Sequence, residues 1–72
     1  MEIIVMFKTP GSTKTLMINQ TSTVNEVRRI HFPLLSDAHQ FVHGGRTMAD
    51  NATFANVADG DTVVLAKDLS GN

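Results

Sequence analysis

Residues 1–19 read MEIIVMFKTPGSTKTLMIN, two β-rich runs on either side of a Pro10-Gly11 pair. Proline presets the first backbone dihedral of a turn, and glycine tolerates positive φ at the next position, so the two runs are expected to form a hairpin. Side chains alternate between the two faces of a strand. This alternation predicts an inward-facing apolar set in the hairpin: Met1, Ile3, Val5, Phe7, Leu16 and Ile18.

The outward positions of the same hairpin also carry apolar side chains, namely Ile4, Met6 and Met17. Single exposed apolar residues are common on soluble proteins, and this is one interpretation. The other is a protein-binding surface or a site of weak self-association, because a contiguous apolar face on a monomer marks an interaction site and methionine adapts to varied partners.

Residues 21–32, TSTVNEVRRIHF, change to a helical period. Thr23 is expected to be the N-cap, and Glu26 follows three residues later as in a capping box. Pro33 should end the helix at about Phe32, because a residue before proline is pushed out of the α region. So short a helix depends on packing against a sheet. One face of this helix is expected to contain Val24, Val27 and either Ile30 or His31.

The second half of the chain predicts two more strands. Residues 40–43 form a brief strand that ends at Gly44-Gly45, a turn that needs positive φ. Residues 46–61 are turn-rich, with Met48, Phe54 and Val57 as anchors to a core. In the final strand, Val63 and Leu65 should face inward and Val64 and Ala66 outward. The order of elements indicates an α+β fold with a four- to five-stranded mixed sheet packed on one short helix.

The stretch from Phe41 to Leu65, FVHGGRTMADNATFANVADGDTVVL, taken with MEIIV at the start and the capped TVNEVRRI, resembles the ubiquitin family. The resemblance runs through essentially the whole chain and implies a β-grasp fold. It divides the chain into a ubiquitin-like domain, residues 1–67, and a flexible C-terminal tail, residues 68–72. The matching positions are Phe41-Val42, Gly45, Met48, Asp50, Thr53-Phe54 and Val57.

The resemblance also implies a shallow apolar patch on the exposed face of the sheet, read by ubiquitin-binding domains. Ala66 and the Thr9-Pro10 turn stand where the family carries larger aliphatic groups, so the patch is reduced. The matching residues, in addition to Thr9 and Pro10 in the first turn, are Val42, Gly45, Arg46, Val64 and Ala66.

Two functions follow from the resemblance. One is a non-enzymatic protein-interaction module that acts through the sheet face on ubiquitin-binding-type domains. The other is a covalent protein modifier, conjugated through its tail by conjugation machinery after trimming to Gly71. In the tail, Gly71 and Asn72 occupy the places of ubiquitin's two terminal glycines, and Asp68 reverses the charge of a recognised arginine. A sulfur carrier of the related β-grasp type is a third, weaker alternative.

Composition argues against several other classes of protein. The formal net charge is −1, with six basic and seven acidic residues, so nucleic acid is a poor partner. Apolar runs are far shorter than the roughly 20 residues of a membrane span, and the start lacks a basic signal-peptide region. We therefore expect a cytoplasmic or nuclear protein that binds no membrane; the absence of cysteine is compatible with that.

Neither catalysis nor a cofactor is predicted. No nucleophile, base and orienting group occur in a pattern that suggests a cleft. The histidines His31, His39 and His43 lack acidic or cysteine partners at ligand spacing, so a structural or surface role is favoured over a metal site.

Overall fold

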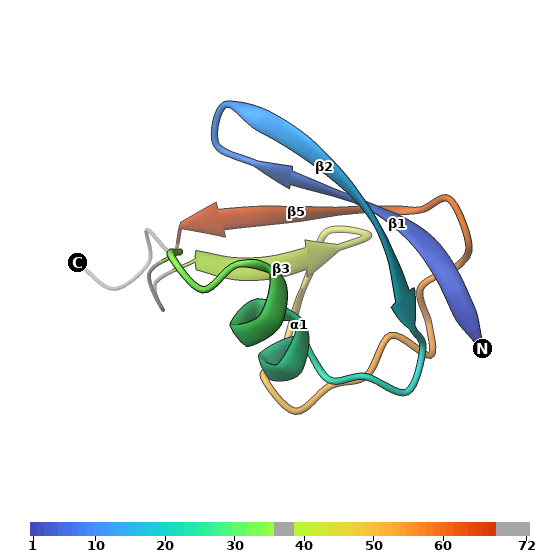
Figure 1. Ribbon diagram of the computed structural model, residues 1–72. Helices are drawn as coiled ribbons and strands as arrows, with labels where there is room; N and C mark the ends of the chain where they lie inside the picture. Colours follow the sequence, from blue (N-terminus) through green and yellow to red (C-terminus); the bar gives the residue numbers. More distant parts are fainter. Residues whose placement is uncertain (36–38, 68–72) are drawn as a thin grey trace.

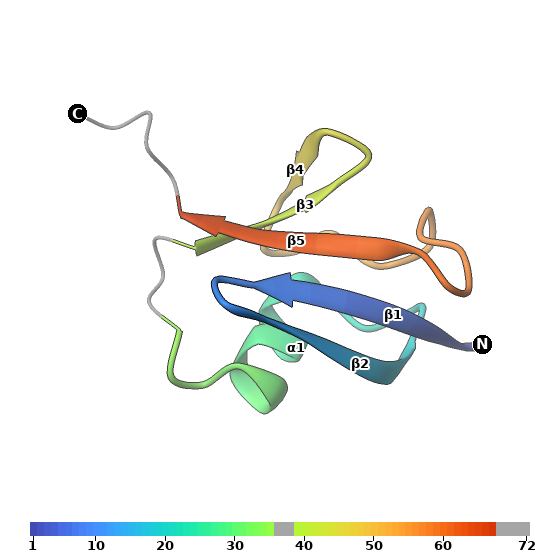
Figure 2. The same ribbon diagram turned by 90° about the horizontal axis from the view of Figure 1, so that it is seen from above.

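The computed structural model describes residues 1–35 and 39–67. In this part of the chain, five strands form one mixed sheet, and one helix lies across one of its faces (Figure 1). The strand order is β2-β1-β5-β3-β4, with β1 and β5 parallel and the other neighbours antiparallel (Figure 2). In chain order the elements are β1 (Glu2–Thr9), β2 (Ser12–Asn19), α1 (Val24–His31), β3 (His39–His43), β4 (Arg46–Met48) and β5 (Thr62–Lys67).

The first two strands form the predicted hairpin. They pair without interruption from Glu2 opposite Asn19 to Thr9 opposite Ser12, and Gly11 turns the chain with φ of 87°. The inward set is confirmed with one exception. Met1 precedes the strand and is 85% exposed. Leu16 is half-buried, and the others are buried: Ile3, Val5, Phe7 and Ile18.

The helix begins at the predicted capping box. The Glu26 N–H donates to the Thr23 hydroxyl oxygen at 3.2 Å, and the Thr23 N–H donates to a Glu26 carboxylate oxygen at 2.9 Å. It ends at His31, and Phe32 caps it, which agrees with the stop expected from Pro33.

The inward face of α1 is also as predicted. Val24 and Val27 are buried, so these two side chains attach the helix to the sheet. Of the two residues left open for the third position, His31 is half-buried, whereas Ile30 is 66% exposed.

The strand β4 was not predicted; its residues were assigned to the turn-rich segment. Gly44 and Gly45 adopt φ of 59° and 79°, as expected, and the turn folds Arg46–Met48 back onto β3. Three residues are too few for a strand period to be visible in sequence. The sheet therefore has five strands, the upper end of the predicted range.

The irregular segment between β4 and β5 is anchored as predicted. Phe54 and Val57 are buried, and Met48 is half-buried against the core. The Phe54 N–H donates to the Gln20 carbonyl at 3.0 Å, and the Gln20 side-chain amide donates to the Val57 carbonyl at 3.0 Å. These contacts fasten the segment to the chain just after β2.

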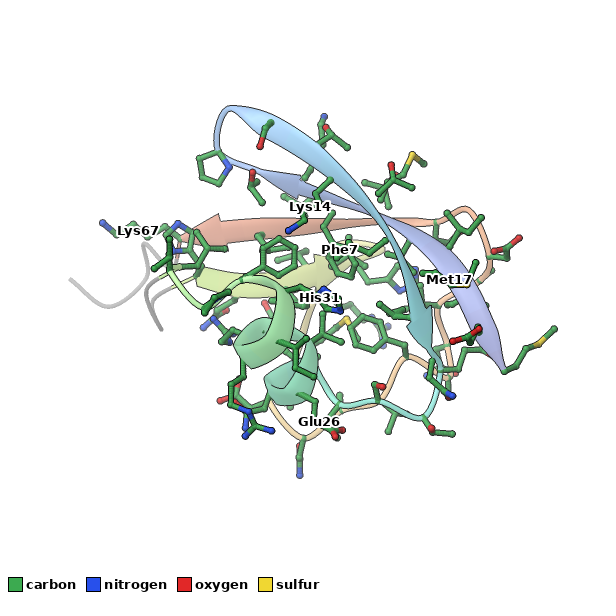
Figure 3. The ribbon with its side chains drawn as sticks, in the orientation of Figure 1. Phe7, Lys14, Met17, Glu26, His31 and Lys67 are labelled. Carbon is green, nitrogen blue, oxygen red and sulfur yellow. The ribbon has the colours of Figure 1, made fainter. Side chains whose placement is uncertain are left out.

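The core lies between the sheet and α1 and contains twelve buried apolar residues among those that the structure describes. All four phenylalanines belong to it. Phe7, labelled in Figure 3, has its ring edge-on to the three others at centroid distances of 5.3, 5.8 and 6.2 Å. The three partner rings are Phe32, Phe41 and Phe54.

The capping box predicts an acid-sensitive contribution to stability. Hydrogen bonds from the backbone and side chain of Thr23 hold the pKa of Glu26 below its ordinary value of 4.5. A lowered folded-state pKa stabilises the fold above the unfolded-state value, and this contribution is lost as the pH falls through the folded-state pKa. We expect Glu26→Gln to lower the urea midpoint at pH 7, and the difference from wild type to shrink between about pH 5 and pH 3. A difference that stays constant across this range would contradict the assignment.

Candidate protein-interaction surface

Within residues 1–35 and 39–67, no helix covers the face of the sheet turned away from α1 (Figure 1). Because residues alternate along each strand, the outward positions of all five strands share this face. We call it the outer face; strand register assigns to it Glu2, Ile4, Met6, Lys8, Thr13, Thr15, Met17, Asn19, Gln40, Val42, Thr47, Thr62, Val64 and Ala66.

One apolar group on the outer face lies on β3 and β5. Val42 is directly opposite Val64, and Val64 is 40% exposed. Residues opposite each other in a sheet have β-carbons about 4.5–5.5 Å apart, so the two valines are neighbours. Ala66 is opposite Gln40, two positions along β5, and is half-buried. The structure therefore brings together Val42 and Val64 and leaves Ala66 as a small extension.

The remaining residues of the predicted patch are not among the outer-face positions. Gly45 is in the β3–β4 turn, and Thr9 and Pro10 are at the tip of the first hairpin. Arg46 is opposite His43, which is two residues after the buried Phe41 on β3. Alternation therefore assigns Arg46 to the helix side of the sheet and not to the outer face.

Thr47, which sequence reasoning missed, takes the place beside Val42. The missing signal was the pairing of β4. Once β4 is known to pair with β3, alternation assigns Thr47 to the outer face and moves Arg46 off it.

A second apolar group lies on the first hairpin. Ile4 is directly opposite Met17, and these side chains are 42% and 61% exposed. Met6 is opposite Thr15 on β2 and beside Thr62 on β5, and it is half-buried. Ile4, Met6 and Met17 are thus adjacent on one face, as the alternation predicted.

The two groups are not separate surfaces, although the sequence suggested two. The parallel register places Met6 beside Thr62 and Lys8 beside Val64, so Met6 and Val64 are diagonal neighbours on β1 and β5. Diagonal neighbours are within reach of long side chains such as methionine. We call the resulting row the diagonal band; it consists of Met17, Ile4, Met6, Val64 and Val42.

The turn before β5 holds the middle of the diagonal band in place. The Ile4 N–H donates to the Asp59 carboxylate at 2.7 Å, the Gly60 N–H donates to the Ile4 carbonyl at 2.7 Å, and the Met6 N–H donates to the Asp61 carbonyl at 3.0 Å. These bonds fix β1 relative to β5. The outer-face register therefore depends on a turn more than 50 residues away in the chain.

His43 has a structural partner in this region. Its Nε2 lies 2.9 Å from a carboxylate oxygen of Asp61, which also accepts the Ala58 N–H at 3.0 Å. The Ala58 hydrogen bond first, and the His43 contact second, hold the pKa of Asp61 below its ordinary value. His43 thereby links the end of β3 to the start of β5.

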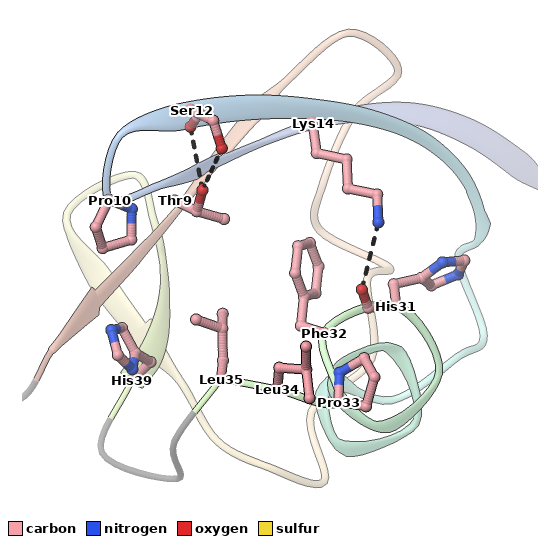
Figure 4. Close-up of a pocket in the computed structure, with 10 residues that line it drawn as sticks. All are labelled: Thr9, Pro10, Ser12, Lys14, His31, Phe32, Pro33, Leu34, Leu35 and His39. Atoms are coloured by element: carbon pink, nitrogen blue, oxygen red, sulfur yellow. Dashed lines mark hydrogen bonds between the residues drawn. The ribbon is translucent and has the colours of Figure 1, made fainter.

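A hollow in the described part of the chain lies away from the outer face (Figure 4). It has a volume of about 500 Å³ and opens between the tip of the first hairpin and the segment after α1. Lys14 extends into it, donating to the His31 carbonyl at 3.4 Å with its ammonium 5.4 Å from the centre of the Phe32 ring. The remaining lining is mainly apolar and includes Pro10, Pro33, Leu34 and Leu35.

Three further observations concern other predicted features. Among residues 1–35 and 39–67, no group of three or more histidine, aspartate or glutamate side chains is placed to hold a metal ion. No helix in that part is long and apolar enough to cross a bilayer. Asp68, Gly71 and Asn72, the tail residues singled out above, lie outside the described residues.

Several solved structures of other proteins are similar to this one. No protein-family model matches the chain, and no curated protein matches it significantly. The ubiquitin-like domain of Plasmodium falciparum Dsk2 is similar with a TM-score of 0.81 and 28% identity, over 94% of this chain and 100% of that one. Ubiquitin from Caldiarchaeum subterraneum gives a TM-score of 0.78 and 26% identity over 99% of both chains.

A third similar structure, a ubiquitin-like domain from Arabidopsis thaliana, has a TM-score of 0.77 at 21% identity, over 92% of this chain and 77% of that one. At this identity, the likeness supports the fold alone. The likeness to the first two extends over nearly the full length of both chains in each pair. It agrees with the five-stranded mixed sheet and the single described helix of this chain. The chain is a divergent ubiquitin-like protein with the β-grasp fold.

Proposed function

We propose that this ubiquitin-like protein is a non-enzymatic interaction module that binds other proteins through the diagonal band. The observation that carries the proposal is the direct pairing of Ile4 with Met17 and of Val42 with Val64 on one open face. Exposed apolar side chains that adjoin one another mark interaction sites more strongly than scattered ones. The partner class is a ubiquitin-binding-type domain with an apolar contact surface.

The diagonal band compensates for the small size of the patch on β3 and β5. Burial of apolar surface contributes about 25 cal/mol per Å², and Ala66 and Thr47 supply little. Ile4, Met6 and Met17 extend the same face with three larger side chains. We expect such a surface to make a weak, transient contact, of the kind that typically buries less than about 1,200 Å².

A pull-down with wild type, Val42→Asp and Met6→Glu tests the proposal. Each variant places a carboxylate in one half of the diagonal band, which must then be desolvated on binding. We expect each to reduce recovery of bound proteins by about tenfold or more. Circular dichroism should show an unchanged fold.

Leu34→Glu is the matched control for this pull-down, because Leu34 is 98% exposed and lies away from the outer face. It introduces the same charge but should leave recovery unchanged. Equal recovery by wild type and both diagonal-band variants would refute the proposal.

The likeness to Caldiarchaeum ubiquitin through 99% of both chains favours a second candidate function, that of a covalent modifier trimmed to Gly71. Asn72 would have to be removed first, because a side chain at the last position obstructs attack. Intact-mass analysis of the protein from its own cells discriminates the two functions. Loss of one asparagine, or a ladder of heavier conjugates, supports the modifier; an unmodified mass alone supports the interaction module.

A further inference from the structure

The strand β2 forms an outside edge of the sheet (Figure 2). Within the described residues it pairs with β1 alone. The Gln20 N–H continues this ladder to the Met1 carbonyl at 2.9 Å, and residues of an antiparallel strand alternate between pairing toward one side and the other. The even-numbered residues of β2 therefore pair with β1, and Thr13, Thr15 and Met17 direct their backbone N–H and C=O groups to the free edge.

This edge lacks most of the protection that sheet edges usually carry. Proteins block exposed edges with short strands, prolines, bulges or several charges. β2 has eight residues in unbroken register, contains no proline and carries one charge, that of Lys14. Its backbone is thus available to accept another strand.

Apolar side chains flank the free edge on both faces of the sheet. Met17 is exposed beside Ile4 on the outer face. On the helix side, Leu16 is half-buried, and Ile30 of α1 is exposed where it borders the groove between α1 and β2. A strand that covers this edge well must therefore be apolar on both of its own faces.

We propose that the occupant is β2 of a second copy, which pairs with β2 in antiparallel fashion about a two-fold axis. β2 has the required pattern, because Leu16, Met17 and Ile18 are consecutive and alternate between its faces. Residues opposite each other in a ladder share a face, so an even-numbered residue must lie opposite an even-numbered one. β2 can therefore pair with β2 of an identical chain, as a two-fold symmetric (isologous) interface requires.

One register fits best, with Leu16 opposite Leu16 of the second copy. Thr15 then lies opposite Met17 of the second copy, and the two symmetric pairs use the free N–H and C=O groups of both residues. The two Lys14 residues lie four positions apart, about 13 Å at roughly 3.3 Å per residue, beyond the Debye length of about 8 Å at physiological ionic strength. Repulsion between them is therefore small.

Such a dimer joins two sheets edge to edge and places both diagonal bands on one continuous face. The contact is small, so the dimer is weak and reversible. Two bands in fixed relation would bind a bivalent partner with greater avidity than either alone. The pairing uses the backbone edge of β2 and not the outer-face carboxylate positions tested above, so it can fail while the proposed function holds, and the reverse.

Sedimentation equilibrium from tens of micromolar to millimolar protein tests the dimer, with Thr15→Pro against Thr15→Ala. Proline is tolerated where the N–H faces away from a sheet, so Thr15→Pro should keep the β1–β2 ladder, as circular dichroism can show. It removes two edge donors per dimer and should weaken association by roughly tenfold or more. Thr15→Ala keeps both donors and should associate like wild type.

Disulfide cross-linking gives a second measurement that does not depend on proline. The chain has no cysteine, so a single introduced one reports only on its own position. In the proposed register, Leu16→Cys brings two β-carbons to about 4.5–5.5 Å and should cross-link rapidly under mild oxidation. Thr13→Cys, six positions from its mate or about 20 Å, should not.

Three results would overturn the proposal. They are a wild type that stays monomeric to millimolar concentration, a Thr15→Pro variant that associates as wild type does, and equal cross-linking by the two cysteine variants. A wild type that is monomeric but gains protection of the Thr15 and Met17 amides on adding an extended peptide would assign the edge to a different occupant.

Discussion

Phe7→Ala is expected to lower the free energy of unfolding by about 3–5 kcal/mol. Phe7 is fully buried, and its ring contacts three other phenylalanines edge-on. The substitution removes buried apolar surface and leaves a cavity among the phenylalanine rings. We expect the surrounding side chains to relax too little to fill this cavity. At roughly 0.05–0.15 kcal/mol per residue, a domain of this length is stable by only about 4–11 kcal/mol. The variant should therefore lose a large part of its stability.

Urea denaturation followed by far-UV circular dichroism measures this effect, because the chain has no tryptophan or tyrosine for fluorescence. Phe7→Leu is the matched control. It retains most of the buried volume and should cost clearly less than the alanine variant. A loss below about 1 kcal/mol in Phe7→Ala would contradict the placement of Phe7 at the centre of the core.

Phe54→Ala is expected to have a comparable effect of about 3–5 kcal/mol, although Phe54 lies outside the helix and strands. Its ring is fully buried against Phe7 and Phe41, and its N–H donates to the Gln20 carbonyl. Truncation would release the segment that leads into β5. That segment also carries the hydrogen bonds to Ile4, so the register of the outer face should loosen as well.

The control for Phe54→Ala is Asn56→Ala, an exposed residue in the same segment that should change stability by no more than about 0.5 kcal/mol. Urea denaturation compares the two variants, and amide exchange at Ile4 and Met6 reports the register. If Phe54→Ala and Asn56→Ala behave alike, the segment is not anchored by its aromatic side chain.

Much of the fold was predictable because its signals are local. The Pro10-Gly11 turn, the Thr23–Glu26 capping box and the stop at Pro33 each depend on residues within a few positions of one another. Alternation identified most of the buried face of the hairpin. The prediction that Met1 faces inward was wrong, because alternation along a strand does not show which of its residues other elements cover.

The candidate surface was less predictable, because it depends on pairing between distant strands. Alternation placed Ile4, Met6 and Met17 on one face of the hairpin. Pairing with β5 was needed to join Met6 to Val64 and so to merge two predicted surfaces into one. Pairing of β4 was needed to replace Arg46 by Thr47 beside Val42.

The sequence by itself determined which residues turn, cap, stop and alternate, and hence the order of the elements apart from β4; its resemblance to the ubiquitin family supplied the β-grasp class. Only the tertiary structure decided the lateral register of the sheet, the diagonal band across four of its strands and the free edge of β2. The physical reason is that turn and cap preferences act within a few residues. Register is instead set by the whole core and by long-range bonds, such as that from the Ile4 N–H to Asp59.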